Sequence, residues 1–274
     1  LFLLTFFMIK KILFPTDFSD ASKIGTEAVK KLKQIGVEDV CLTHVIDLNK
    51  IIGPVSGVDI PAVIENYEKE SLENLKKFAE NLRDFNVKII PPKVGDPAST
   101  ICDIAEEENV DMIAIPYHGK GLLAEILLGS VSEGVVKKSR KPVFVIKFKN
   151  VKFDDLFKRI LYCYDFSENA NKLRDYVKLF AKVGGEVLIT HVIEKGKLED
   201  EKLKHLDIIR EEFENAKIIL REGVPYKEIL RVADETNATL IAMGHSGEGL
   251  LRYLGGTSYN VVRRAKIPVF VYKT

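Results

Sequence analysis

Short runs of apolar residues alternate with amphipathic segments along the first half of the chain. The runs are continuous rather than interrupted by polar residues, which is typical of parallel strands buried on both faces. The predicted strands are Ile9–Phe14, Asp39–Ile46, Val87–Val94, Val110–Ile115 and Pro142–Phe148. Because strands and helices alternate, we expect βαβ units with right-handed crossovers and a parallel sheet.

The segments between the strands place apolar residues at helical spacing. The first helix is expected to begin at Ser19 or Asp20, either of which can cap it, and to end at Gly36. Pro97 suits the first turn of a later helix, and the last helix covers Ser130–Ser139. The long helix between the first helix and Pro97 is predicted to bury one stripe of side chains: Ile64, Tyr67, Ser71, Leu75, Phe78, Leu82 and Phe85.

The second half of the chain repeats the first. Lys11–Ser19 matches Arg159–Ser167 at five of nine positions, and Ile101–Leu123 matches Ile229–Leu251 without a gap. The matches come in the same order in both halves, so one domain is present twice.

This repeat predicts the domain organisation. We expect two tandem doubly wound α/β domains, each a five-stranded parallel sheet flanked by helices, over residues 9–148 and 158–274. Residues 149–157 are the expected linker, and residues 1–8 an N-terminal extension outside the fold. A chain of 274 residues is long enough for two such domains, each with its own core.

Composition narrows the class of protein. The chain is 46% apolar and 30% charged with a formal net charge of +1, which describes a globular protein with no bulk electrostatic reason to bind nucleic acid. Cys41, Cys102 and Cys163 form no CxxC pair, which favours reduced thiols in a cytoplasmic protein. The apolar residues 1–9 are too few to span a membrane. We therefore expect no nucleic-acid partner and no membrane partner.

The segment from Pro116 to Ser130 is the strongest candidate for a binding site. It joins the end of a buried strand, a glycine-containing loop and the start of a helix, where unpartnered N–H groups and the helix dipole favour an anion. Pro116, Gly119, Gly129 and Ser130 are expected around a phosphate. The alternative is that Ser130 only caps the helix, because Ser130-x-x-Glu133 fits a capping box.

Other polar residues follow the strand ends. Asp17 could accept a hydrogen bond from a ribose hydroxyl, or could simply be a carboxylate at a helix N-terminus. His118 lies in the glycine loop and could contact a phosphate, although exposed loop histidines without a task are commoner. His44 and His191 are interpreted as packed histidines rather than catalytic ones.

Several catalytic motifs do not occur in the sequence. It contains no GxxxxGK[ST] loop, no HExxH and no GxSxG, and no GxGxxG follows the first strand. No catalytic residue and no metal ligand is therefore assigned. A phosphate site without an evident base suggests binding rather than turnover.

These motifs resemble the universal stress protein family in its tandem two-domain form. The family's nucleotide signature is G-x2-G-x9-G-[S/T], and the first copy reads Pro116-Tyr-His-Gly119, nine residues, then Gly129-Ser130. The leading glycine is replaced by Pro116. The second copy has Gly244-His-Ser-Gly247 but only seven residues before Gly255-Gly256. The resemblance implies the Rossmann-like, adenine nucleotide alpha hydrolase-like fold.

The resemblance also implies which residues hold an adenine nucleotide. In the first copy these are Pro15, Thr16, Asp17 and Val45 at adenosine, and Pro116, His118, Gly119, Gly129, Ser130 and Val131 at the phosphates. The corresponding residues of the second copy are Asp165, Val192, Gly244, Gly247, Gly255, Gly256 and Thr257. The shorter second loop favours AMP or no nucleotide there.

The function implied is a cytoplasmic stress-response or signalling protein that binds ATP or AMP, with Mg²⁺ carried on the phosphates. A homodimer of the tandem chain and a further protein partner are expected from the resemblance. Two alternatives stay open: a slow Mg-dependent ATPase or phosphotransferase using the same pocket, and a nucleotide-free protein-interaction module.

Overall fold

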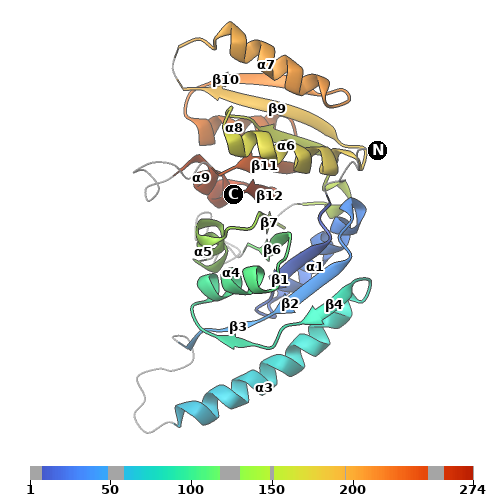
Figure 1. Ribbon diagram of the computed structural model, residues 1–274, viewed down its shortest axis with the longest axis vertical. Helices are drawn as coiled ribbons and strands as arrows, with labels where there is room; N and C mark the ends of the chain where they lie inside the picture. Colours follow the sequence, from blue (N-terminus) through green and yellow to red (C-terminus); the bar gives the residue numbers. More distant parts are fainter. Residues whose placement is uncertain are drawn as a thin grey trace, which may run out of the picture. The chain divides into compact units, whose positions relative to one another are not determined.

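The computed structural model describes residues 8–48, 59–117, 130–148, 151–194, 196–245 and 256–273. The chain divides into two compact units, Ile9–Val143 and Phe144–Thr274, called here the first and second units. Both are built of parallel strands and helices (Figure 1). The predicted α/β class with a parallel sheet flanked by helices is confirmed.

The main sheet of the first unit has the strand order β6-β1-β2-β4, and the β1–β2, β1–β6 and β2–β4 pairs are parallel. Its strands are β1 (Lys11–Pro15), β2 (Asp39–Thr43), β4 (Asn86–Ile89) and β6 (Met112–Pro116); β7 (Val143–Ile146) begins at the boundary between the units. Its helices are α1 (Asp20–Leu32), α3 (Ile60–Ala79), α4 (Pro97–Glu107) and α5 (Ser130–Lys138).

The sheet of the second unit has the order β10-β9-β8-β11-β12, and all four neighbouring pairs are parallel. Its strands are β8 (Arg159–Cys163), β9 (Glu186–Ile193), β10 (Lys217–Glu222), β11 (Leu240–Gly244) and β12 (Val269–Tyr272). Its helices are α6 (Glu168–Ala181), α7 (Asp200–Glu211), α8 (Pro225–Glu235) and α9 (Thr257–Arg264). This is the predicted five-stranded doubly wound order. The order in which the chain adds strands reverses between β8 and β11, while the strands stay parallel.

The helix boundaries follow the predicted caps. Ser19 is the N-cap of α1, and its hydroxyl accepts a hydrogen bond from the Ser22 N–H at 3.2 Å. After α1 the chain makes a 3₁₀ turn, Lys33–Ile35, and stops at Gly36, whose φ of 101° lies in the left-handed region that favours glycine. Ser167 caps α6 in the same way as Ser19 caps α1.

The prediction of one continuous strand over Asp39–Ile46 was wrong. The strand is interrupted at His44, and β3 (Val45–Ile46) pairs with β5 (Lys93–Val94) in a separate two-stranded sheet. The neighbouring strand is interrupted at Pro91 and Pro92, which have no N–H to donate to a ladder. In the second unit, where no proline intervenes, β9 and β10 run unbroken.

The predicted buried stripe of α3 was right only toward its C-terminal end. Ser71, Leu75 and Phe78 are buried, as are Leu82 and Phe85 beyond the helix. Tyr67, however, is 40% exposed. The first half of α3 extends away from the main sheet, so Tyr67 is not covered by that sheet (Figure 1).

The predicted linker contains buried residues as well as polar ones. Phe153–Asp155 forms a 3₁₀ turn, after which Leu156 and Phe157 are buried. Phe157 stacks on Phe180 of α6 with ring centroids 5.5 Å apart. This end of the segment therefore packs into the core of the second unit.

Candidate functional site

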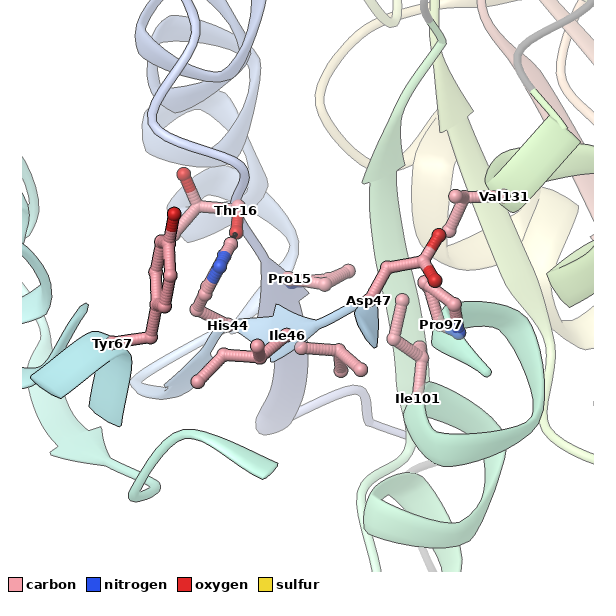
Figure 2. Close-up of a pocket in the computed structure, with 10 residues that line it drawn as sticks. Pro15, Thr16, His44, Ile46, Asp47, Tyr67, Pro97, Ile101 and Val131 are labelled. Carbon is pink, nitrogen blue, oxygen red and sulfur yellow. Dashed lines mark hydrogen bonds between the residues drawn. The ribbon is translucent and has the colours of Figure 1, made fainter. Parts of the chain in front are cut away.

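A cavity of about 240 Å³ lies at the carboxyl end of β1 in the first unit. This is the edge of a doubly wound sheet at which ligands bind, next to the point where β1 and β6 run side by side and the strand order reverses. Figure 2 shows Tyr67 on one side of the cavity and Asp47, Pro97 and Val131 on the other. The residues lining it are Pro15, Thr16, His44, Val45, Ile46, Asp47, Tyr67, Pro97, Ile101 and Val131.

Most of the lining is apolar and comes from separate elements. Pro15 ends β1, Val45 and Ile46 form β3, Ile101 belongs to α4, and Val131 is the second residue of α5. Such walls suit a flat, weakly polar body such as a heterocycle, and the volume is close to the lower end of the roughly 300–1,000 Å³ usual for ligand pockets.

The polar part of the lining is held by hydrogen bonds to the backbone. His44 Nδ1 lies 2.7 Å from the carbonyl oxygen of Thr16 (Figure 2). A carbonyl only accepts, so Nδ1 carries the proton and donates it. The Thr16 N–H donates to the carbonyl of Thr43 at 2.9 Å, and the Thr16 hydroxyl accepts from the Phe18 N–H at 3.0 Å. These three hydrogen bonds fix the position of Thr16.

The break between β2 and β3 places His44 in this position. At His44 the chain leaves the main sheet, and the His44 carbonyl accepts from the Lys93 N–H of β5 at 3.3 Å. The half-buried imidazole turns to Thr16, just after the end of β1. His44 is thus a pocket residue as well as a packed histidine.

Asp17 is exposed and is not among the described residues that line the cavity. Its Oδ1 accepts from the Ser19 N–H at 3.1 Å, from the Ser19 hydroxyl at 2.6 Å and from the Ser22 hydroxyl at 2.7 Å. These bonds organise the first turn of α1. They fit the alternative interpretation of Asp17 as a helix N-terminal carboxylate, and its contact with ribose stays a prediction.

Pro116 ends β6 and is buried against α1 rather than placed in the cavity lining. A Cβ on Gly25 would lie 3.0 Å from Pro116 Cγ and 3.3 Å from Phe14 Cζ. Because Gly25 has no side chain, the ring of Pro116 can occupy this space. In the second copy Gly244 stands in place of Pro116, and the residue aligned with Gly25 is the buried Leu173.

Helices α4 and α5, which both contribute to the cavity, are packed closely together. A Cβ on Gly134 of α5 would lie 2.5 Å from Ala98 Cβ of α4, so only glycine permits this approach. Lys138 Nζ also pairs with Asp96 Oδ1, the N-cap of α4, at 2.8 Å. Hydrogen bonds from Lys138 and Ser99 hold the pKa of Asp96 well below its usual range. This packing sets the positions of Ile101 and Val131.

The phosphate part of the predicted site is only partly within the described residues. Ser130 is exposed and is the first residue of α5, and Val131 follows it at the cavity wall. The start of a helix, the end at which the helix dipole favours an anion, therefore lies at the cavity. His118, Gly119 and Gly129 lie outside the described residues.

In the second copy the predicted residues also follow the strand ends. Asp165 is exposed and accepts from the Ser167 N–H at 3.0 Å, and Val192 lies in β9. Gly244 ends β11, Gly256 is the N-cap of α9, and Thr257 is the first residue of that helix. Gly247 and Gly255 lie outside the described residues.

Four predicted residues thus line one cavity: Pro15, Thr16, Val45 and Val131. The sequence interpretation missed Ile46, Asp47, Tyr67, Pro97 and Ile101 as lining residues, and it treated the remaining one, His44, as a packed histidine. Asp47 carried a usable signal, because it follows the carboxyl end of the second predicted strand. Tyr67 and Ile101 carried none, because helical spacing predicts the buried face of a helix and not which residue borders a cavity.

Among the described residues no group of three or more histidine, cysteine, aspartate or glutamate side chains is arranged to hold a metal ion. None of the helices in the described ranges combines the length and apolar character needed to cross a membrane.

Comparison with known proteins places the chain in a family. The model of the universal stress protein family matches residues 8–147 and again 156–273. Universal stress protein MJ0577 of Methanocaldococcus jannaschii is 43% identical over 162 residues, which cover 52% of this chain and 98% of that protein. The crystal structure of a universal stress protein from Archaeoglobus fulgidus DSM 4304 has a TM-score of 0.82 and 36% identity, covering 98% of this chain and 97% of that one. The chain is a tandem two-domain member of the universal stress protein family.

Proposed function

We propose that this chain is a cytoplasmic adenine-nucleotide-binding protein of stress response or signalling, with ATP or AMP held in the first unit. The single observation that carries the proposal is that Pro15, Thr16, Val45 and Val131, from three segments far apart in the sequence, line one cavity. The resemblance to the family implies these four residues independently of any coordinates. The apolar walls suit the adenine ring.

The residues present fit a nucleotide in two respects. Thr16 is 5% exposed and held by three hydrogen bonds, to Thr43, Phe18 and His44, so this part of the cavity is preorganised. The cavity also borders Val131 at the start of α5, where a helix dipole favours negatively charged phosphates. In the proposal Asp17 contacts ribose, and Pro116, His118, Gly119, Gly129, Ser130 and Val131 surround the phosphates.

Nucleotide occupancy would act by changing what the protein binds, since the sequence contains no evident base for phosphate hydrolysis. Mg²⁺ would enter only with the phosphates. A homodimer of the tandem chain and a separate protein partner belong to the same proposal. Slow ATP hydrolysis and a nucleotide-free interaction module are the competing functions.

Titration calorimetry with the full chain tests the proposal, using ATP, AMP, adenosine and inorganic triphosphate in separate runs. We expect ATP or AMP to bind, adenosine to bind more weakly, and triphosphate alone to bind weakest. No heat with any adenine compound would reject the proposal and leave the interaction module. Timed phosphate release with ATP, compared between the wild type and Ser130→Ala, separates binding from hydrolysis.

A matched pair of variants locates the site. Val45→Trp places an indole in the cavity and should lower nucleotide affinity at least tenfold. Val224→Trp adds the same bulk at a position of the second unit that is 47% exposed, and should leave affinity unchanged. Circular dichroism of both variants checks that each remains folded. Equal affinity for both variants would place the nucleotide elsewhere.

A further inference from the structure

The strand ends of the two units have the same backbone arrangement. The Thr16 N–H donates to the Thr43 carbonyl at 2.9 Å, and the Tyr164 N–H donates to the Thr190 carbonyl at 2.8 Å. His191 Nδ1 donates to the Tyr164 carbonyl at 2.8 Å, as His44 does to that of Thr16. Tyr164 therefore stands where Thr16 stands.

The next residues of the two units also correspond. Phe18 and Phe166 both have positive φ, 62° and 63°. Each phenylalanine ring lies on the histidine of its own unit, with centroids 4.7 Å apart for Phe18–His44 and 4.8 Å for Phe166–His191. The two strand ends therefore share one backbone arrangement and differ in the side chains that it carries.

The side chain that replaces Thr16 is large and fully packed. Tyr164 is 1% exposed. Its ring stacks on His205 of α7, with centroids 5.8 Å apart and planes 16° from parallel, and meets Phe166 edge-on at 5.1 Å. In the first unit the corresponding long helix is α3. Its Tyr67 is 40% exposed and lines the cavity.

The hydroxyl of Tyr164 is also satisfied within the protein. It donates to Asn171 Oδ1, because an amide oxygen only accepts. With its single proton used there, it accepts from His205 Nε2, 2.8 Å away, which places a proton on that nitrogen. A ring that is packed on its face, on its edge and at its hydroxyl is costly to displace.

We propose that Tyr164 and His205 fill the second unit's counterpart of the cavity, so that the chain binds one nucleotide, in the first unit. Thr16 and Tyr164 are then the residues that decide which copy binds. This inference rests on the proposed function. It departs from the expectation that Asp165 and Val192 contact a second adenosine, and it assigns the second copy a structural role at this edge.

The test is the number of ATP molecules bound per full-length chain, measured by calorimetry and by equilibrium dialysis. We expect one for the wild type. The double variant Tyr164→Thr/His205→Ala opens the second cavity and should bind two. Tyr164→Phe keeps the ring and removes only the hydroxyl, so this control should still bind one.

The reciprocal variant, Thr16→Tyr, keeps the inference testable if the opened double variant fails to fold. It should fill the first cavity and abolish binding. Two nucleotides on the wild type, or normal binding by Thr16→Tyr, would overturn the inference while leaving nucleotide binding intact. One nucleotide on a folded double variant would also overturn it.

A different result would reject the proposed function. A wild type that binds none rejects nucleotide binding by the first unit. If the double variant then binds one, closure of the second unit stands without the proposed function. No binding by either protein rejects both proposals.

Discussion

His44 Nδ1 donates a 2.7 Å hydrogen bond to the carbonyl of Thr16, so the residue at which the chain leaves the main sheet after β2 holds the residue that follows β1. The same bond joins His191 to Tyr164 in the second unit at 2.8 Å. The bond is therefore part of the repeated fold. In the first unit the histidine and its partner also line the cavity.

His44→Ala should weaken adenosine and ATP binding by about 1–2 kcal/mol, because the Thr16 carbonyl loses its donor and the cavity loses one wall. Calorimetry measures the change. His191→Ala removes the equivalent bond in the second unit and is the matched control: it should lower the melting temperature but not the affinity. An equal loss of affinity in both variants would contradict the placement of the nucleotide.

Asp17→Ala separates the two interpretations of that carboxylate. If Asp17 accepts from ribose, the variant should bind adenosine about 1–3 kcal/mol more weakly and bind the free adenine base as the wild type does. Titrations with the two compounds make the comparison.

Asp165→Ala is the control for this experiment, because Asp165 organises the start of α6 through Ser167 as Asp17 does for α1 through Ser19. Both variants should lose some thermal stability. If Asp17→Ala shows no greater loss of adenosine affinity than Asp165→Ala, then Asp17 is only a helix-terminal carboxylate.

Gly134→Ala should destabilise the protein by about 1–3 kcal/mol and also weaken nucleotide binding. The new methyl group would meet Ala98 Cβ at 2.5 Å, which forces α4 and α5 apart. Ile101 and Val131, one on each helix, would then separate. Urea unfolding and calorimetry measure the two effects.

The double variant Ala98→Gly/Gly134→Ala removes the clash from the other side. It should recover affinity and most of the stability lost in Gly134→Ala. If the double variant binds no better than Gly134→Ala, the cavity does not depend on the close packing of these two helices.

Glu108→Gln should make the stability of the protein less sensitive to acid. Glu108 Oε2 accepts from Lys88 Nζ at 2.7 Å and from Lys11 Nζ at 3.3 Å. The hydrogen bond from Lys88 lowers the pKa of Glu108, helped by that from Lys11 and opposed by burial. A carboxyl with a lowered pKa in the folded state stabilises the fold above its unfolded pKa of 4.5, and loses this contribution as the pH falls through the folded value.

We therefore expect Glu108→Gln to cost roughly 0.5–1 kcal/mol of unfolding free energy at pH 7, and progressively less below pH 4.5. Urea midpoints of the two proteins at pH 7 and pH 3 provide the measurement. A difference that stays constant with pH would mean that the ion pairs with Lys88 and Lys11 do not contribute.

The strand pattern was predictable because a parallel strand buried on both faces must be apolar throughout. That argument found the main strands of the first half of the chain, but it could not detect the break at His44, since β2 and β3 are equally apolar across it. The break depends on the neighbouring strand, where Pro91 and Pro92 interrupt the ladder. Tyr67 was assigned to the core for a related reason: spacing shows which residues share a helix face, but not where that face passes beyond the sheet.

The sequence by itself determined the tandem repeat, the α/β class, the cap at Ser19, and the short list of residues at strand ends, because each depends on neighbours in the chain or on a repeated pattern. Only the tertiary structure decided that Val131 lies with Thr16 and Val45 at one cavity, and that Tyr164 is buried under His205 in the other unit. These outcomes depend on side-chain volume between elements far apart in the sequence. The exchange of Thr16 for Tyr164 is visible in the sequence, but its effect depends on the neighbouring helix. In the first unit Tyr67 lines a cavity with Thr16, and in the second unit His205 stacks on Tyr164.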